Sequence, residues 1–517
     1  MNSPAKSKAA KWAVRLFFTL ACLVTLFALF HVEENWRGER DWNAYKQQME
    51  ARGEKFDLAA FIPPRVPDDQ NFAMTPFFAP LFDFEPGTQK QRDTNAVKRI
   101  QNFASSLAIA PKPYSWAMGK RADLAQRLAA FQKPTDTPAK STTTQAAGET
   151  TQTKAATAIL EKMGEYNPIL DELRAASRRP HCRFNISYDV ENPVTILLPH
   201  LTVVRRICSV VQLRALAKLA SGQTDSALDD VNFMFYLSDS MKNEPMLISL
   251  LVRMANLNMA VQVIWEGLVD HRWSDAQLQA LQARLQSSDL LADYKRALQG
   301  ERAGFGNRTI EYLIKASNRN ALFAIMDGQE SLVRNMMLGS IPRGWIRMEQ
   351  LNYNRIFEDT IFPTFDVAAK RVHPKIIIKN TEAFGDSVKI PFQAVCQHRV
   401  LLHLLCPAVD ACSLRSSNAQ TMVDEAMTAC ALERHRLANS QFPEELDALV
   451  PRFMATLPHD IITGEPLKYR KNGDGFVLYS VGWNEKDDGG VPGMVHDKSS
   501  RADLQQGDWV WQCPARK

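Results

Sequence analysis

The most continuous apolar run in the chain lies close to its start, at residues 16–30, and contains no charged residue. With its flanks, residues 12–32 are just long enough to cross a bilayer, because lysine and arginine side chains snorkel to the interface. Basic residues precede the run and acidic residues follow it, namely Lys6, Lys8, Lys11 and Arg15, then Glu33 and Glu34. This charge step predicts a cytoplasmic tail at residues 1–11 and an external remainder.

The same run is also short enough to be the apolar region of a cleaved signal peptide. Cleavage needs small residues after the run, whereas this chain has Phe30, His31 and Val32 there. The sequence therefore favours an uncleaved, single-pass anchor. Either interpretation puts the bulk of the chain outside the cytoplasm.

Apolar residues recur at helical spacing from residue 158 onward and predict a domain of helical hairpins over residues 158–412. The first strong helix is predicted at residues 199–220, and Thr224 is a suitable N-cap for the helix that follows. Ser274 and Gln277 have the spacing of a capping box ahead of a leucine-rich helix.

A third helix of this domain is predicted at residues 246–265, and it is almost wholly apolar. Its apolar run is interrupted by Arg253, Asn256 and Asn258. These polar residues favour a buried helix over a second membrane span. Another long helix is predicted at residues 289–316.

The remaining segments are less regular. Residues 33–132 contain a short helical stretch at 42–53 and a proline-rich part, and are interpreted as a collar laid over the main domain. Residues 133–157 are rich in Thr, Ala and Gln, and are predicted to form a disordered, dispensable surface loop because they offer little apolar surface to bury. Prolines break up residues 339–389, where the β-branched run at 375–379 suits a short edge strand.

Near the C-terminus, residues 421–438 carry an apolar face at helical spacing and predict a helix. Asn439 is suited to the left-handed conformation that ends a helix. Pro443 then begins a short second helix that extends to Leu449.

Two short strands are predicted after these helices, at residues 466–470 and 476–480, joined by the Asn-Gly-Asp-Gly turn at 472–475. Residues 508–511 are suited to a third strand. A helix covering a small antiparallel sheet is a stable layer arrangement, so residues 413–517 are expected to form an α+β module. The predicted fold class is mainly α, with helical hairpins, this small module and one N-terminal transmembrane helix.

The same region resembles the soluble domain of the major pseudopilin of type II secretion. The resemblance covers roughly the last fifth of the chain and depends on a combination of short segments. These are Leu432-Glu433, Arg436-Leu437-Ala438-Asn439, Phe442-Pro443, Leu446, Ala448-Leu449-Val450, Leu457-Pro458-x-Asp460, Gly464-x-Pro466-x-x-Tyr469 and Leu478-Tyr479-Ser480-Val481-Gly482.

The chain departs from that family upstream of the module. A pseudopilin has a Gly-Phe-Thr processing motif and a long hydrophobic helix there, whereas this chain has Gln397, His398 and Arg399. As a whole it resembles uncharacterised, membrane-anchored bacterial proteins that carry such a domain, and these bring no known activity. The resemblance implies a bacterial inner-membrane protein whose bulk is periplasmic, with envelope or secretion-type proteins as partners.

An acidic loop, residues 483–490, follows the matching Leu-Tyr-Ser segment, and in the major pseudopilins the loop at this place holds calcium. Calcium prefers six to eight oxygen ligands from carboxylates, amides and carbonyls in a flexible loop. Asn484, Asp487 and Asp488 offer three such side chains, and Asp497 is a candidate fourth ligand. The alternative is a solvated acidic turn, which the presence of Lys486 favours.

Other chemistry finds little support in the sequence. The net charge is +5 with both signs interspersed, so no nucleic-acid partner is expected. No HExxH, GxSxG, Walker or GxGxxG pattern is present. The adjacency of His181 and Cys182 is interpreted as coincidence, because the partners of a catalytic triad are normally distant in sequence. The adjacent Glu301 and Arg302 are interpreted as a solvated pair.

Cysteine usage is equally uninformative about catalysis. The chain has 8 cysteines at irregular spacings, without a CxxC pair. Zinc ligation is conceivable only at Cys396, His398, His403 and Cys406, whose spacing differs from common zinc sites. Buried thiols with one or two disulfides are the favoured interpretation.

The sequence therefore predicts a non-enzymatic, membrane-anchored envelope component that acts in scaffolding or secretion-type assembly. The alternative is an extracytoplasmic hydrolase whose site is assembled from distant residues. A cleft with clustered acids or a His–carboxylate pair would favour the hydrolase. The sequence does not determine the oligomeric state.

Overall fold

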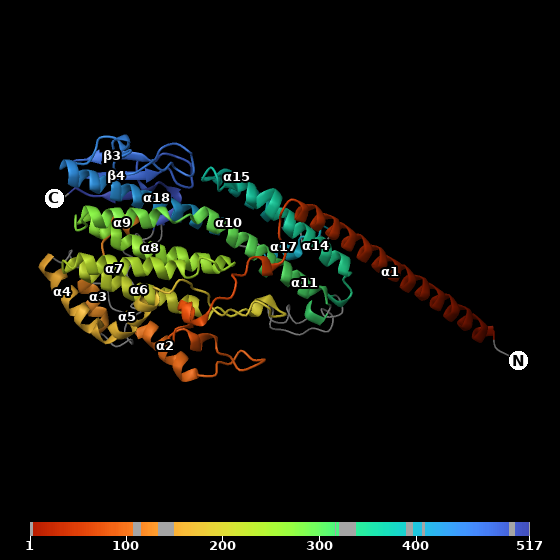
Figure 1. The fold of residues 1–517 in the computed structure, drawn as a ribbon. Coiled ribbons are helices and arrows are strands. Elements are labelled where there is room, and N and C mark those ends of the chain that lie inside the picture. The colour runs from red at the N-terminus through yellow and green to blue at the C-terminus, as the bar shows by residue number, and fades with distance from the viewer. Residues whose placement is uncertain are drawn as a thin grey trace.

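The structure is a computed structural model that describes residues 4–106, 115–132, 149–315, 317–319, 338–388, 397–405, 409–495 and 502–515. These residues are mostly helical, with small antiparallel sheets toward the C-terminal end and a long apolar helix at the N-terminus. The predicted fold class is therefore confirmed. Figure 1 shows an elongated body, with the N-terminal helix projecting from one end and the C-terminus at the other.

The N-terminal helix α1, Pro4–Ala51, runs without a break from the apolar segment into the body. The short helix predicted at 42–53 is the last part of this helix. α1 is long and apolar enough to cross a membrane, and so, by length and composition, are the segments Pro193–Ala220 and Leu247–Val269. Those two segments are 44% and 61% buried inside the protein, whereas the apolar window of α1 is 0% buried.

α1 crosses helix α14, Arg343–Ile356, at two glycines. A Cβ atom at Gly38 would overlap the backbone of Gly344, and one at Gly344 would overlap the backbone of Glu34. The contact is reinforced by polar bonds, because Trp345 Nε1 donates to Glu34 Oε2 at 2.9 Å and Gly344 N donates to Asn35 Oδ1 at 2.9 Å. Backbone-to-backbone packing therefore joins α1 to the body.

The centre of the body is a stack of antiparallel helices, as predicted (Figure 1). They are α6 Pro199–Ala220, α7 Thr224–Asp239, α8 Leu247–Val269, α9 Asp275–Gln286 and α10 Leu290–Gly300. The predicted capping box is present, with Ser274 and Gln277 bonded reciprocally at the start of α9. Thr224 is the first residue of α7 and Gln223 is its N-cap, so the prediction for Thr224 was wrong by one position.

The long helix predicted at 289–316 is divided by a wider turn. After α10 the chain forms a π-helical segment, η8 Glu301–Asn307, and then α11 Arg308–Ile314. Asp289 is the N-cap of α10, and its side chain accepts from Ala292 N. π-helical turns inside α-helices are frequent at functional sites.

Four helices lie beneath α6 in the view of Figure 1, on the far side from the C-terminal sheet: α2 Thr94–Ser106, α3 Leu124–Gln132, α4 Glu149–Lys162 and α5 Asn167–Ala176. Residues 149–157, part of the predicted disordered loop 133–157, are helical in α4, so that part of the prediction was wrong. Ala155 and Ala156 are buried in this helix. Their small side chains fit against the body, although the polar composition of the stretch did not indicate burial. Residues 133–148 lie outside the described ranges.

Short helical turns connect the longer helices and strands. They are η1 Leu58–Ala60, η2 Asp68–Gln70, η3 Phe72–Met74, η4 Ala79–Phe82, η5 Trp116–Met118, η6 Met163–Tyr166, η7 Pro193–Thr195, η9 Phe357–Ile361, η10 Phe362–Thr364 and η11 Leu446–Leu449. η11 corresponds to the second short helix of the C-terminal module, which was predicted to begin at Pro443.

The region predicted as irregular, 339–389, contains α14, the two-stranded sheet β1 Phe365–Asp366 with β2 Arg371–Val372, and α15 Pro374–Val388. α17, Val400–Leu405, follows. The edge strand suggested at 375–379 was wrong, because these residues are helical in α15. Pro374 at the first helical position starts the helix, and this preference outweighs the β-branched run.

The C-terminal module contains α18 Val409–Asn439 and a sheet of order β3-β4-β7, with β3 Lys468–Asn472, β4 Gly475–Ser480 and β7 Trp509–Cys513. The predicted hairpin and third strand are confirmed. A separate pair is formed by β5 Pro492–Met494 and β6 Ala502–Gly507. The left-handed residue after α18 is Ser440, with φ of 63°, and not Asn439 as predicted.

α18 begins at Val409, well before the predicted start at 421. α18 packs against α8, α9 and α10, and its added turns contact α10, where Leu290 N donates to Gln420 Oε1 and the Tyr294 hydroxyl is hydrogen-bonded to Ser413. The helix therefore belongs to the body as well as to the module. Many of its polar residues are buried, including Ser416, Ser417 and Gln420.

The crossing of α1 and α14 yields a prediction. Gly38→Leu should force the two helices apart, and overpacking of this kind costs about 1–3 kcal/mol. Hydrogen exchange should then become faster in α14 and in residues 33–41 of α1. Gln47→Leu, at an exposed position of the same helix, should leave exchange unchanged. Equal exchange in both variants would contradict the backbone contact.

Candidate functional site

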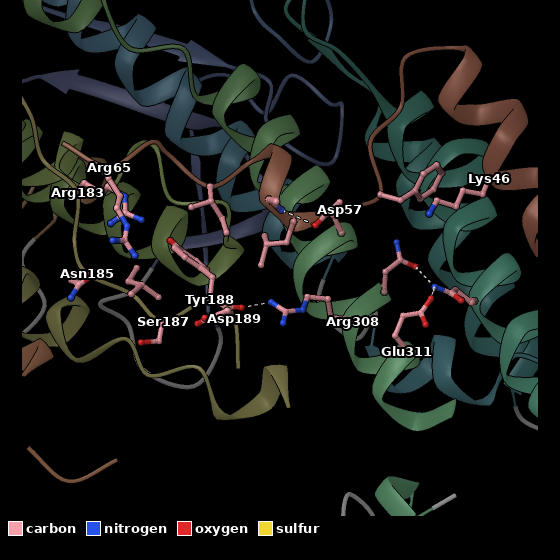
Figure 2. A pocket seen from close by; sticks show the side chains of 18 of the residues that line it. Lys46, Asp57, Arg65, Arg183, Asn185, Ser187, Tyr188, Asp189, Arg308 and Glu311 are labelled. Carbon is pink, nitrogen blue, oxygen red and sulfur yellow. Dashed lines mark hydrogen bonds between the residues drawn. The ribbon is translucent and has the colours of Figure 1, made fainter. Parts of the chain in front are cut away.

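A cavity with a volume of about 660 Å³ lies where the end of α1 meets the body. Its walls come from five parts of the chain: the last turns of α1, residues 56–65, residues 183–189, η8 with α11, and Gln350 of α14 (Figure 2). Clefts of this size are typical of ligand sites. No local sequence pattern marked this cleft, because its walls meet only in the folded chain.

One wall is an extended segment in which burial alternates. Phe184, Ile186 and Tyr188 are buried in the core. The residues between and beside them are less buried and line the cleft, namely Arg183, Asn185, Ser187 and Asp189. Such alternation is the pattern of a β-strand with one face in the core. The segment nevertheless belongs to no sheet of the described residues; its one bridge joins His181 to Asn71.

The opposite wall is held by a buried polar network. Arg302 of η8 is 0% exposed and pairs with Glu54, at 2.5 Å, and with Glu358. The amide of Asn354 donates to Asn307 Oδ1 at 2.7 Å. A buried charge is stable only when it is paired and hydrogen-bonded, so these contacts fix η8 against the residues that follow α1.

The same wall is tied to α1 through Arg347 on α14. Its guanidinium donates to Glu39 Oε2 at 2.9 Å, to Glu311 Oε1 at 2.5 Å and to Gln350 Oε1 at 2.7 Å. Glu311 and Gln350 line the cleft. The position of α1 and the shape of the cleft are therefore mechanically linked.

Charged side chains of both signs face this cleft. The basic residues are Lys46, Arg65, Arg183 and Arg308, and the acidic residues are Asp57, Asp189 and Glu311. Two of the acids are already engaged, because Asp57 accepts from Ala59 N and Glu311 from Arg347. Arg65 makes no hydrogen bond or ion pair with any described residue, which leaves its charge available to a ligand.

In the predicted metal loop, residues 483–490, the candidate ligand side chains are hydrogen-bonded to neighbouring protein groups. Asp487 Oδ1 accepts from Gly489 N at 3.0 Å and from the Tyr479 hydroxyl at 3.1 Å. The Asn484 amide donates to Asp488 Oδ2 at 2.9 Å, so its nitrogen faces that carboxylate. Asp497 lies outside the described residues.

Asp508 is the acid of this loop that the sequence did not indicate. It is 2% exposed and accepts from Asp488 N at 3.1 Å and from Gly490 N at 2.6 Å. Asp508 immediately precedes β7, and the pairing of β7 with β4 brings it beside the loop. Of the predictions made from the sequence, only the third strand included this residue. No group of three or more metal-ligating side chains occurs in the described parts of the chain.

Two His–carboxylate pairs occur among the described residues, and such pairs are the feature that would favour a hydrolase. His200 Nε2 lies 2.8 Å from Glu244 Oε1, and the Ser249 hydroxyl donates to the other oxygen of Glu244 at 2.5 Å. His200 and Ser249 are 0% exposed, so a substrate has no access to them. The second pair, His271 with Glu433, lines none of the cavities of about 660, 440 and 290 Å³.

The adjacent pairs noted in the sequence have structural roles. Burial raises the pKa of the Cys182 thiol, which makes it a poor nucleophile. Burial also raises the pKa of Glu301 to about 6, and its carboxyl accepts from Leu247 N at the start of α8. The interpretation of Glu301-Arg302 as a solvated pair was wrong, because Arg302 is fully buried.

Of the conceivable zinc ligands, His398 alone has a described side chain, and its ring lies 5.3 Å from that of Trp345. Cys396 and Cys406 fall outside the described residues, as does the side chain of His403. Among the described cysteines, no disulfide joins Cys22, Cys182, Cys208, Cys412 or Cys430 to another residue.

A second cavity, of about 440 Å³, lies between α9, α18 and residues 453–459. Asp424 of α18 lines it and accepts from Gln420 Nε2 at 3.1 Å. Burial raises the pKa of Asp424 to about 7. Burial also raises the pKa of its neighbour Glu425 well above the usual value, and the nearby Asp460 and Asp424 raise it further.

The chain matches no protein-family model, no curated protein and no solved structure. The resemblance of residues 432–482 to the major pseudopilins therefore depends on the quoted residues alone.

Calcium binding by the acidic loop stays a prediction. If calcium binds only the folded state, it should stabilise the protein by about 2.7 kcal/mol at a hundredfold excess over the dissociation constant. The melting temperature of the whole chain should then be higher with calcium than with chelator. An unchanged value, or a rise that survives Asp487→Ala combined with Asp488→Ala, would remove the site.

The buried Asp424 predicts a pH effect on stability. Its pKa in the folded protein, about 7, exceeds the ordinary value of 3.8, so its contribution is fully present below about pH 4 and is lost as pH rises through 7. Asp424→Asn should make the free energy of unfolding fall less between pH 4 and 8, by about 1–3 kcal/mol. Urea unfolding at several pH values measures this. Asp447→Asn, at an exposed acid, should behave as wild type.

Proposed function

We propose that the protein is a non-enzymatic, single-pass scaffold of the bacterial envelope. In this proposal α1 crosses the inner membrane, residues 1–11 stay in the cytoplasm, and the body stands in the periplasm. The observation that carries the proposal is the continuity of α1 from its apolar segment into the body, where Gly38 and Gly344 bring α1 and α14 into backbone contact.

The surface of α1 supports a membrane span. Trp12 and Trp36 are 71% and 62% exposed, and they flank the apolar segment. Because a helix rises 1.5 Å per residue, the two indoles are separated by about 36 Å along the axis, close to the spacing of the two interfaces of a bilayer. Tryptophan is enriched at both interfaces. The other two apolar helices are packed into the body, which supports a single span.

The part of α1 beyond the apolar segment supports a scaffolding role. Trp42 and Met49 of α1 form a hydrophobic cluster with Phe56 and with Leu351 of α14. The anchor is therefore a structural element of the body and not a tether. A body fixed in this way presents its far end at a constant height and orientation, which is the property that a scaffold needs.

The C-terminal module is the proposed assembly element. It lies at the end of the body away from α1 (Figure 1), and β3 is an edge strand of its sheet. The resemblance to pseudopilins supports secretion-type proteins as partners. The two His–carboxylate pairs of the described residues line none of the three cavities, so they do not support the hydrolase alternative.

The topology can be tested with reporters. A reporter fused after Lys517 should be active only in an extracytoplasmic assay, and one fused before Met1 only in a cytoplasmic assay, because the charge step orients α1. Extraction of the membranes with high salt should leave the protein bound. Cytoplasmic activity of the C-terminal reporter, or release by salt alone, would contradict the proposal.

A further inference from the structure

We propose that the cleft at the end of α1 binds an extended acidic peptide of another protein, which adds as a strand beside residues 186–189. This inference goes beyond the scaffold proposal, since it assigns a partner of defined chemistry to a particular site. It holds whichever side of a membrane the body occupies, so failure of the topology test would leave it standing.

The backbone of the extended segment supplies the first argument. Arg183 is fixed at both backbone groups by the Asn71 side chain, Ile186 N donates to Phe184 O, and the carbonyls of Tyr188 and Val190 accept from Arg308. By contrast, the backbone N–H and C=O groups of Ser187 and Asp189 have no hydrogen-bond partner among the described residues.

Ser187 and Asp189 are two positions apart, and in a strand alternate residues direct their backbone groups to the same side. The segment therefore presents a short row of free donors and acceptors, comparable to the edge of a sheet. Such edges are templates for pairing with another chain. Addition of a peptide strand to an exposed edge is an established mode of recognition.

The location of this edge supplies the second argument. Ser187 and Asp189 are exposed and line the cleft, whereas the alternate residues Ile186 and Tyr188 are buried and hold the backbone against the core. The edge is thus anchored in one conformation before a partner arrives, which lowers the entropic cost of binding. The cleft of about 660 Å³ beside it gives space for a peptide's side chains.

The charge of the cleft defines the peptide. Figure 2 shows Arg65 and Arg183 at one end of the cleft and Lys46 toward the other. Arg65 has no partner among the described residues, and Arg183 donates its Nε to the carbonyl of Pro63 at 2.9 Å, which leaves its charge uncompensated by a carboxylate. Opposite charges across a strand pair stabilise it, so carboxylates are the side chains that these cations favour.

Asp189 sets a limit on this preference. Its carboxylate faces the same cleft and would repel an acidic side chain placed directly opposite. An alternating peptide can avoid this conflict, because its carboxylates can sit near Arg65 and Lys46 while an apolar residue faces Asp189. The proposed partner is therefore a segment that alternates acidic and apolar residues.

A small anion is the rival occupant of the same cations. Inorganic phosphate would require the guanidinium groups of Arg65 and Arg183 but not the backbone N–H of Ser187. Binding of a peptide can thus be distinguished from binding of phosphate by a substitution that removes this N–H and leaves every charge in place.

The probe is a short, fluorescein-labelled peptide of alternating valine and glutamate, added to the detergent-solubilised full chain. Ser187→Pro removes the free N–H, and the matched control Ser187→Ala removes the hydroxyl but keeps the N–H. Ser187→Pro should weaken binding by about tenfold, because strand hydrogen bonds are lost, while Ser187→Ala should bind as wild type. Arg65→Gln should weaken binding by about threefold, with a smaller effect at high salt.

Proline also restricts the residue before it, so the melting temperature of each variant is measured alongside. If Ser187→Pro fails to fold, the same question is put to the wild-type chain with a probe methylated at alternate backbone nitrogens, which should bind about tenfold more weakly. Absence of binding by the unmethylated probe overturns the proposal. So does equal binding by Ser187→Pro and Ser187→Ala, or full displacement of the probe by millimolar phosphate.

Discussion

The contact between Gly38 and Gly344 is the constraint on which the rest of this structure depends. Without side chains at these positions, α1 and α14 approach until their backbones touch, and Trp345 and Asn35 then complete the contact with hydrogen bonds. The depth of this crossing sets the distance of α1 from η8 and α11. It therefore shapes one side of the cleft, which is lined by α1, the residues that follow it, residues 183–189, η8, α11 and Gln350.

Buried ion pairs fix the arrangement of the helices that lie farther from α1. Asp230 of α7 is 0% exposed and accepts from Arg214 at 2.6 Å, Lys218 at 2.8 Å and Arg174, which come from α6 and α5. Arg253 of α8 pairs with Asp239 and Asp293 in the same way. Removal of one member would leave its partners buried and unpaired, so such networks fix the register of helices more than they add to stability.

Local patterns gave the elements whose formation is local. The bounds of α6 follow from Pro199 and the turn at Gly222, the start of α9 from the Ser274 capping box, and the β3–β4 hairpin from its glycine turn. The patterns were insufficient where tertiary packing decides. α18 buries polar residues that weaken its apolar face, and the cleft and Asp508 depend on segments that only the folded chain brings together.

The unbroken course of α1 has a consequence for how this chain tolerates change in length. A flexible tether can gain or lose residues freely, but a continuous helix turns by about 100° and advances by 1.5 Å with each one. Insertion of one residue between Phe30 and Glu34 would rotate the apolar segment about the helix axis relative to the body. Height and rotation therefore change together: an insertion near a whole number of turns restores the direction in which the body faces, but shifts the body by about 5.4 Å per turn along the helix axis.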